Sequence, residues 1–248
     1  MPISGIGYSS PIYSQLSSGR RINSAADDAA GSAIAAHLAS QATQQSTQAR
    51  NDSITQSALN VSDEALGSIS DSLQRIRELS VQASNGTYTA NDRSSIQDEI
   101  NQLKEGISSV ARNTEFNTQK LLDGSSSVGG VSNNATLDAL GISDYDVTSG
   151  NFDIQKIDDA ISMVSSMRSG TGATSNALDQ SIAYERLSSQ QMVSSQSAIE
   201  DLDIGSAVSE LKKQQVLEQY QIFTQKAILN QQAQEAGLLQ TMSMNNVQ

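Results

Sequence analysis

The residues of this chain that could perform chemistry are few, and their spacing completes no known catalytic or metal site. Asp27 and Asp28 are adjacent acids that could bind a metal or transfer protons, but acidic residues beside a helix start more often serve the helix dipole. His37 is the single histidine and lies in an Ala-rich stretch without a partner motif. One histidine excludes zinc sites that need two or three imidazoles, including the His-Glu-x-x-His protease motif.

Two other motifs are incomplete. Asp144 and Asp146 resemble the start of a calcium loop, but glycine stands at the seventh position instead of the sixth, and no glutamate follows at the twelfth. Gly170 and Gly172 lack a preceding strand and a third glycine, so they indicate a flexible connection and not a phosphate cradle. The absence of cysteine excludes disulfides and thiolate chemistry. We therefore expect no enzyme, no cofactor and no metal.

The composition narrows the class of protein and its partners. Only 4% of the 248 residues are aromatic, with three Phe and six Tyr, which favours an elongated shape with a thin apolar seam over a compact globule. The formal charge of −12 repels phosphate backbones, so we expect no nucleic-acid partner. No run of 18 apolar residues is present, and the N-terminus has no basic or long apolar segment. We expect neither membrane insertion nor a cleaved secretory signal.

Long helices must position these residues. Proline occurs only at positions 2 and 11, so the strongest helix breaker is missing from the rest of the chain. Residues 25–84 are rich in Ala, Gln, Leu and Ile and predict one long helix. Its seam, spaced by three and four residues as lengthwise helix packing requires, comprises Leu59, Ser62, Leu66, Ile69, Leu73, Ile76, Ser80 and Ala83.

A second helix follows after a short connection, which predicts an antiparallel pair. Its apolar stripe is Ile96, Ile100, Leu103, Ile107 and Val110. Residues 113–123 predict a short hairpin and residues 124–134 an exposed loop. Residues 137–157 mix apolar residues with turn formers and predict a small β patch or an irregular cap.

The C-terminal part returns to helix. We expect a helix from Ile157, an interruption at 169–172, and a long helix over 176–202. The last helix, after Gly205, has apolar residues on more than one side, which implies that another subunit covers it. The fold class is therefore mainly α: an elongated antiparallel long-helix rod or coiled-coil bundle, with a short β-hairpin and a small irregular cap in the middle of the chain.

Both flanks of the chain resemble bacterial flagellins, in the order in which that family carries its motifs. The N-terminal match starts at the run Leu-Ser-Ser-Gly-Arg-Arg-Ile-Asn-Ser-Ala-Ala-Asp-Asp-Ala-Ala-Gly. The matching segments are residues 16–31, 73–87, 95–100, 114–117 and 197–201. The resemblance covers about residues 16–124 and 176–240, and its length at both ends makes it specific.

The resemblance implies a fold in which the two arms pair as a helical rod with variable residues inserted between them. The domains would be 1–25 plus 205–248, a terminal coiled-coil region; 26–124 plus 176–204, a helical rod; and 125–175, a short variable cap. The implied function is a structural subunit of the flagellar filament that is exported, self-assembles through helix packing and serves motility. The implied location is secreted, in the extracellular flagellum.

Two departures from the family pattern keep alternatives open. Residues 1–15 form a shorter arm than most flagellins have and contain both prolines. Residues 241–248 lack the usual leucine-rich, basic end. The alternatives are a minor flagellin, a hook–filament junction protein, or a secreted flagellin-like monomer that acts as an adhesin or innate immune receptor ligand.

The resemblance also implies partners and the residues that meet them. Partners are further copies in a helical filament, an export chaperone, the flagellar type III export apparatus, filament cap and junction proteins, and an animal Toll-like receptor. Arg75 and Leu79, one turn apart, are expected to share a helix face. Receptor candidates are Gln74, Arg75, Leu79 and Glu99; candidates for packing between subunits are Arg20, Ile22, Asp27, Asp28, Val216, Tyr220 and Phe223; export-chaperone candidates are Leu211, Leu217, Ile228 and Leu238.

Overall fold

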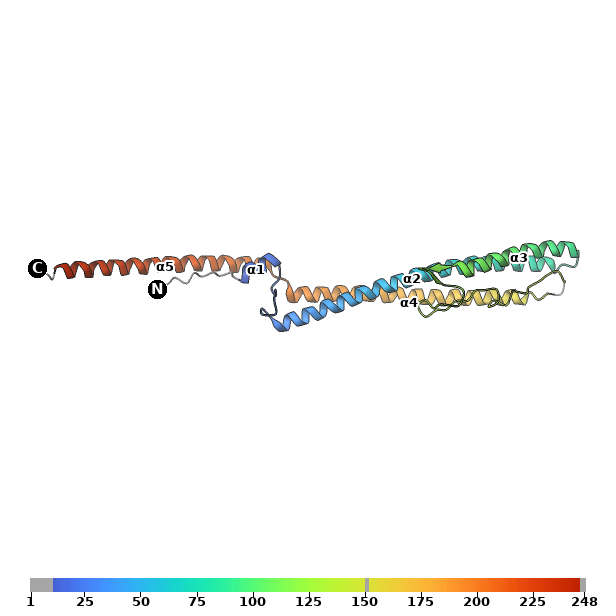
Figure 1. Ribbon diagram of the computed structural model, residues 1–248, viewed down its shortest axis with the longest axis horizontal. Coiled ribbons are helices and arrows are strands. Elements are labelled where there is room, and N and C mark those ends of the chain that lie inside the picture. Colours follow the sequence, from blue (N-terminus) through green and yellow to red (C-terminus); the bar gives the residue numbers. More distant parts are fainter. Residues whose placement is uncertain (1–10, 150–151, 246–248) are drawn as a thin grey trace. The chain divides into compact units, whose positions relative to one another are not determined.

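The computed structural model describes residues 11–149 and 152–245, with side chains described as far as residue 237. The elements are α1 (Pro11–Ser18), α2 (Ala29–Ala83), α3 (Ala90–Asn113), β1 (Glu115–Phe116), β2 (Gln119–Lys120), α4 (Gln155–Glu200) and α5 (Ile204–Asn245) (Figure 1). The chain divides into two compact units, residues 1–41 with 191–248 and residues 42–190. None of the described helices is both long and apolar enough to cross a bilayer.

The unit of residues 42–190 packs α3 beside the adjoining parts of α2 and α4 around one apolar core (Figure 1). The predicted seam of α2 faces this core, because its members from Leu59 to Ala83 are all buried. The stripe of α3 meets it, with Ile100 and Ile107 completely buried. The antiparallel α2–α3 pair is confirmed by the ion pair between Arg75 and Glu99, which lie on opposite sides of the short connection.

Helix α3 starts where its sequence supplies a cap. The Thr89 side chain accepts a hydrogen bond from the backbone N–H of Asp92, and the Asp92 carboxylate accepts one from the backbone N–H of Thr89. This reciprocal capping box satisfies two N–H groups that the first turn leaves without helical partners. The hydrogen bonds lower the pKa of Asp92, because they favour its ionised form.

The hairpin predicted over 113–123 is present. Strands β1 and β2 are antiparallel and pair Glu115 with Lys120 and Phe116 with Gln119. Asn117 and Thr118 make the turn with positive φ angles of 49° and 65°. Positive φ at both central residues is the backbone that a two-residue hairpin turn requires, because its twist matches that of the strands.

The segment after the hairpin is anchored from within. Asn133 is 4% exposed, and its Nδ2 donates to Ser62 Oγ of α2 and to Thr171 Oγ1 of α4, each at 3.1 Å. One buried amide therefore ties this segment to both long helices. Of the segment 137–157, expected as a small β patch or an irregular cap, residues 137–149 form irregular turns without a strand, and α4 already begins at Gln155.

The helix interruption predicted at residues 169–172 is wrong. Helix α4 runs without a break from Gln155 to Glu200 and includes Gly170 and Gly172. A glycine inside a helix costs about 1 kcal/mol of stability relative to alanine. Burial of the α4 side chains in the core contributes more stabilisation than that. Thr171 between the two glycines is 1% exposed, which shows that this turn is part of the core-facing side.

Candidate functional site

The N-terminal segment of residues 16–31 folds back onto the end of α4. The backbone N–H of Arg21 donates to the carbonyl of Glu200 at 2.6 Å, and the N–H of Leu202 donates to the carbonyl of Gly19 at 3.0 Å. The Arg20 guanidinium pairs with the Glu200 carboxylate at 3.4 Å. Arg20, a candidate for packing between subunits, thus joins the N-terminal segment to the end of α4 in its own chain.

The two acids of this segment build the start of α2. Asp27 Oδ2 accepts hydrogen bonds from the backbone N–H groups of Ser24 and Asn23, at 2.8 and 3.0 Å, and these bonds hold the pKa of Asp27 below its usual value. Asp28 Oδ1 accepts from the backbone N–H of Gly31 at 2.8 Å, as an N-cap does. Neither belongs to a group of acidic or histidine side chains that could hold a metal, and the described residues contain no such group.

Gly31 is the residue that allows this turn to close. A Cβ atom at this position would lie 2.4 Å from Asp28 Oδ2 and 2.8 Å from Ile22 Cδ1. Ile22 itself is 5% exposed, so this predicted packing residue is part of the turn's own apolar contact. The segment therefore needs its glycine, acid and isoleucine together for its internal geometry.

Helix α5 presents an uncovered apolar surface in the described part of the chain. All described side chains from Lys212 to Gly237 are exposed. Its large apolar side chains are 53–71% exposed: Val216, Leu217, Tyr220, Ile222, Phe223, Ile228 and Leu229. The chaperone candidate Leu211 is half-buried, and the side chain of Leu238 lies outside the described residues. A helix with apolar residues on several sides is normally buried, which makes α5 the strongest candidate for an interface with another molecule.

The receptor candidates divide between surface and core. Arg75 Nη2 lies 2.8 Å from Glu99 Oε1, and Arg75 Nη1 lies 3.1 Å from Glu78 Oε2. Hydrogen bonds to Glu99 first and Glu78 second raise the pKa of Arg75. Leu79, one turn further along α2, is 2% exposed, so of this pair only Arg75 reaches the surface. Four residues advance about 40° beyond a full turn, which is enough here to move Leu79 into the core.

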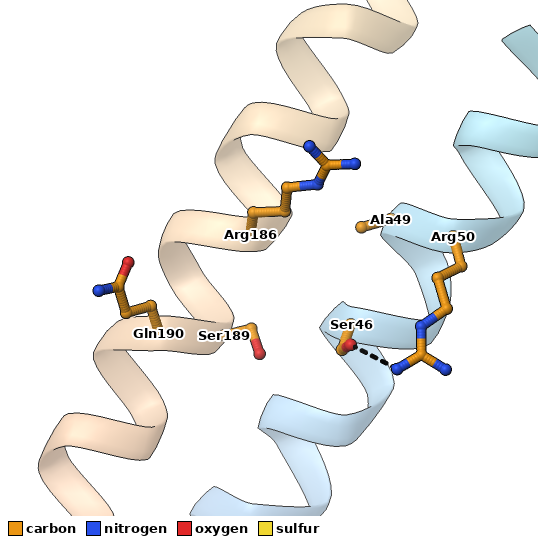
Figure 2. A pocket seen from close by; sticks show the side chains of 6 residues that line it. All are labelled: Ser46, Ala49, Arg50, Arg186, Ser189 and Gln190. Carbon is orange, nitrogen blue, oxygen red and sulfur yellow. Dashed lines mark hydrogen bonds between the residues drawn. The ribbon is translucent and has the colours of Figure 1, made fainter.

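A polar cleft between α2 and α4 is a feature that sequence analysis did not identify. Two guanidinium groups and four small or polar side chains line it in Figure 2. The lining residues are Ser46, Ala49, Arg50, Arg186, Ser189 and Gln190. Neither arginine has a carboxylate partner among the described residues. The two arginines lie 136 positions apart in the sequence, so only the packing of the helices brings them to one cleft.

Comparisons with known proteins agree in pointing to one family. A family model described as the bacterial flagellin N-terminal helical region matches residues 10–127, and one described as the C-terminal helical region matches residues 154–240. The flagellin of Halalkalibacterium halodurans is 34% identical over 223 residues, covering 83% of this chain and 82% of that protein. The flagellin of Bacillus subtilis strain 168 is 35% identical over 255 residues, covering 83% and 84%.

Other matches are partial. The flagellin of Clostridium tyrobutyricum is 48% identical over 116 residues, which are 47% of this chain and only 31% of that relative. Among solved structures, the crystal structure of Bacillus cereus flagellin has 30% identity and a TM-score of 0.48, and the match covers 55% of this chain and 88% of that one.

Proposed function

This chain belongs to the bacterial flagellin family, and from that membership we propose how its surfaces serve the flagellar filament. It is a structural subunit that self-assembles through helix packing into the filament outside the cell, and its contribution to motility follows from that role. The family is one of structural proteins and not of enzymes. What remains to be assigned is which surface meets which partner.

We assign the contact between copies to α5, and the observation that carries this is its uncovered apolar side chains. Val216, Tyr220 and Phe223 are 54%, 68% and 71% exposed. Burying three such side chains against another copy contributes several kcal/mol at about 25 cal/mol per Å² of apolar area. The segment of Arg20, Ile22, Asp27 and Asp28 acts indirectly, since it fixes the start of α2 against the end of α4. The three-part division into residues 1–25 with 205–248, 26–124 with 176–204, and 125–175 is proposed on the same grounds.

Before assembly, α5 needs a different binding partner, because an exposed apolar helix promotes aggregation. We propose that an export chaperone binds it through Leu217 and Ile228, which are 53% and 55% exposed, together with Leu211 and Leu238. The chain would then pass to the flagellar type III export apparatus and be secreted, and filament cap and junction proteins would meet it at the filament.

The chaperone proposal is tested on the full chain co-expressed with a flagellin export chaperone. Wild type is expected to co-purify as a stoichiometric complex, and Leu217→Asp with Ile228→Asp to weaken binding at least tenfold in calorimetry. The matched control is Gln221→Asp with Gln225→Asp, which adds the same charges to exposed positions of the same helix. If both double variants bind as wild type does, α5 is not the chaperone site.

An exposed ion-pair cluster supports a second role, as a ligand of the Toll-like receptor that detects flagellins. Arg75, half exposed, pairs with Glu99 from α3, and Gln74 is exposed beside it. Leu79 would support this surface from the core. In a receptor reporter assay, Arg75→Asp should lower the signal of the free monomer at least tenfold, while Arg112→Asp, at another exposed arginine, should leave it unchanged. Equal signals from wild type and Arg75→Asp would rule out this contact.

A further inference from the structure

The cleft between α2 and α4 presents two arginines that form no ion pair with any carboxylate of the described residues. Arg50 donates only to Ser46 Oγ, at 3.4 Å, and Arg186 has no carboxylate partner in the described part of the chain. The helices come close here because their facing residues are small, and Ser189 Oγ donates to the carbonyl of Ala42 at 3.0 Å. The chain has 27 acidic and only 15 basic residues, a formal charge of −12, so two neighbouring arginines without a carboxylate partner are a notable feature.

The opposite imbalance occurs further along α2. Asp63 pairs with Arg168 of α4, whose Nε lies 3.0 Å from Asp63 Oδ1, and two further acids of α2, Glu64 and Asp71, follow nearby in the sequence. Asp63 contributes most to raising the pKa of Arg168, and the fields of Asp71 and Glu64 add to it. Glu64 and Asp71 are three and four residues from Gly67 and share its face of α2, and a Cβ atom at Gly67 would lie 4.0 Å from Arg168 Cζ of α4. Neither acid has an ion-pair partner among the described residues.

Spacing places both charge groups along one face of α2. Glu64 follows Arg50 by two heptads, and Asp71 follows Glu64 by one. Residues one heptad apart differ by only about 20° in their direction around the helix axis. At 1.5 Å per residue, the acids lie about 21 and 32 Å from Arg50 along the helix. The face is positive at Arg50 and negative at Glu64 and Asp71. Its charges therefore complement those of a second copy only when the two copies are displaced along the helix axis.

We propose that the Arg50–Arg186 cleft receives the carboxylates of Glu64 and Asp71 from a second copy of this chain. Arginine suits this role because its planar guanidinium binds a carboxylate with two parallel hydrogen bonds. The contact is heterologous, since one patch meets a different patch of the next copy, and such contacts propagate into open polymers. The inference rests on the filament function and names a polar contact in addition to the apolar contact of α5.

Charge reversal in the full-length chain tests the pairing. Arg50→Glu with Arg186→Glu, and separately Glu64→Lys with Asp71→Lys, should each raise the critical concentration for assembly at low salt about tenfold. An equimolar mixture of the two double variants should assemble at close to the wild-type concentration, because each cleft then faces an opposite charge. Sedimentation of polymer across protein concentrations measures all three.

Matched controls separate the contact from folding and from net charge. Arg112→Glu with Lys156→Glu makes the same charge change at two exposed cations of the same unit and should assemble as wild type does. Circular dichroism should show an unchanged helix content in every variant. Normal assembly of Arg50→Glu with Arg186→Glu, or failure of the mixture to recover, overturns the inference while wild type still polymerises. Failure of wild type itself would instead contradict the filament function on which the inference rests.

Discussion

Replacing Leu73 with alanine is expected to lower the free energy of unfolding by about 3 kcal/mol. Leu73 is completely buried where α2 meets the core that it shares with α3 and α4. Removing three of its carbon atoms forfeits the transfer free energy of those groups and leaves a cavity that rigid helices fill poorly. Urea unfolding followed by circular dichroism at 222 nm measures the change as a shift of the midpoint.

Val81→Ala is the matched control for this experiment, because Val81 is on the same helix but 49% exposed. Its effect should stay below about 0.5 kcal/mol, as is usual for surface substitutions. A Leu73→Ala variant as stable as Val81→Ala would mean that the seam of α2 does not form the core of this unit.

The second large effect is on assembly and not on folding. Tyr220→Asp with Phe223→Asp should abolish polymer formation, because both side chains are the most exposed aromatic residues of α5 and would place charge within an apolar contact. The monomer should unfold at the same urea concentration as wild type, since neither side chain is buried in it. Sedimentation and urea unfolding of the same preparation measure the two properties separately.

Gln221→Asp with Gln225→Asp provides the control for added charge, since both glutamines are exposed on the same helix. If this control assembles and the aromatic variant does not, the contact between copies is assigned to the apolar side chains. If the aromatic variant polymerises normally, α5 does not carry the contact between copies.

The elements with regular spacing were the ones that sequence analysis predicted well. The three–four spacing from Leu59 to Ala83 identified the buried face of α2, because a helix side that packs lengthwise must repeat its apolar residues at that interval. The short hairpin was also predicted correctly. In both cases the information is local, so a single stretch of sequence contains it.

The errors and omissions have a different physical origin. Gly170 and Gly172 were interpreted by their weak helix propensity, but the packing of α4 around Thr171 outweighs that local preference. The cleft of Arg50 and Arg186 could not be found from spacing, because it exists only where two distant helices meet. The one-turn spacing of Arg75 and Leu79 predicted a shared helix face, but spacing alone does not reveal that Leu79 is buried, because the residues that cover it come from other elements.

The pairing of the two flanks lies between these cases. Their motifs indicated a common family, but not that Arg21 and Leu202 would exchange backbone hydrogen bonds with Glu200 and Gly19. The resemblance implied that the two arms pair, with residues 1–25 assigned to residues 205–248, whereas these hydrogen bonds join residues 19–21 to residues 200–202. Such long-range contacts require the whole fold, because about 180 residues separate the two segments that they join.

Polymerisation of the purified wild-type chain tests the central claim most directly. Concentrated protein is brought to assembly conditions with ammonium sulfate, which strengthens apolar burial, and is imaged by negative-stain electron microscopy. Long filaments of uniform diameter, absent from the Tyr220→Asp, Phe223→Asp preparation, are the predicted result. Monomers that persist at every concentration, or only amorphous aggregate, would contradict the assignment of this chain as a filament subunit that assembles through α5.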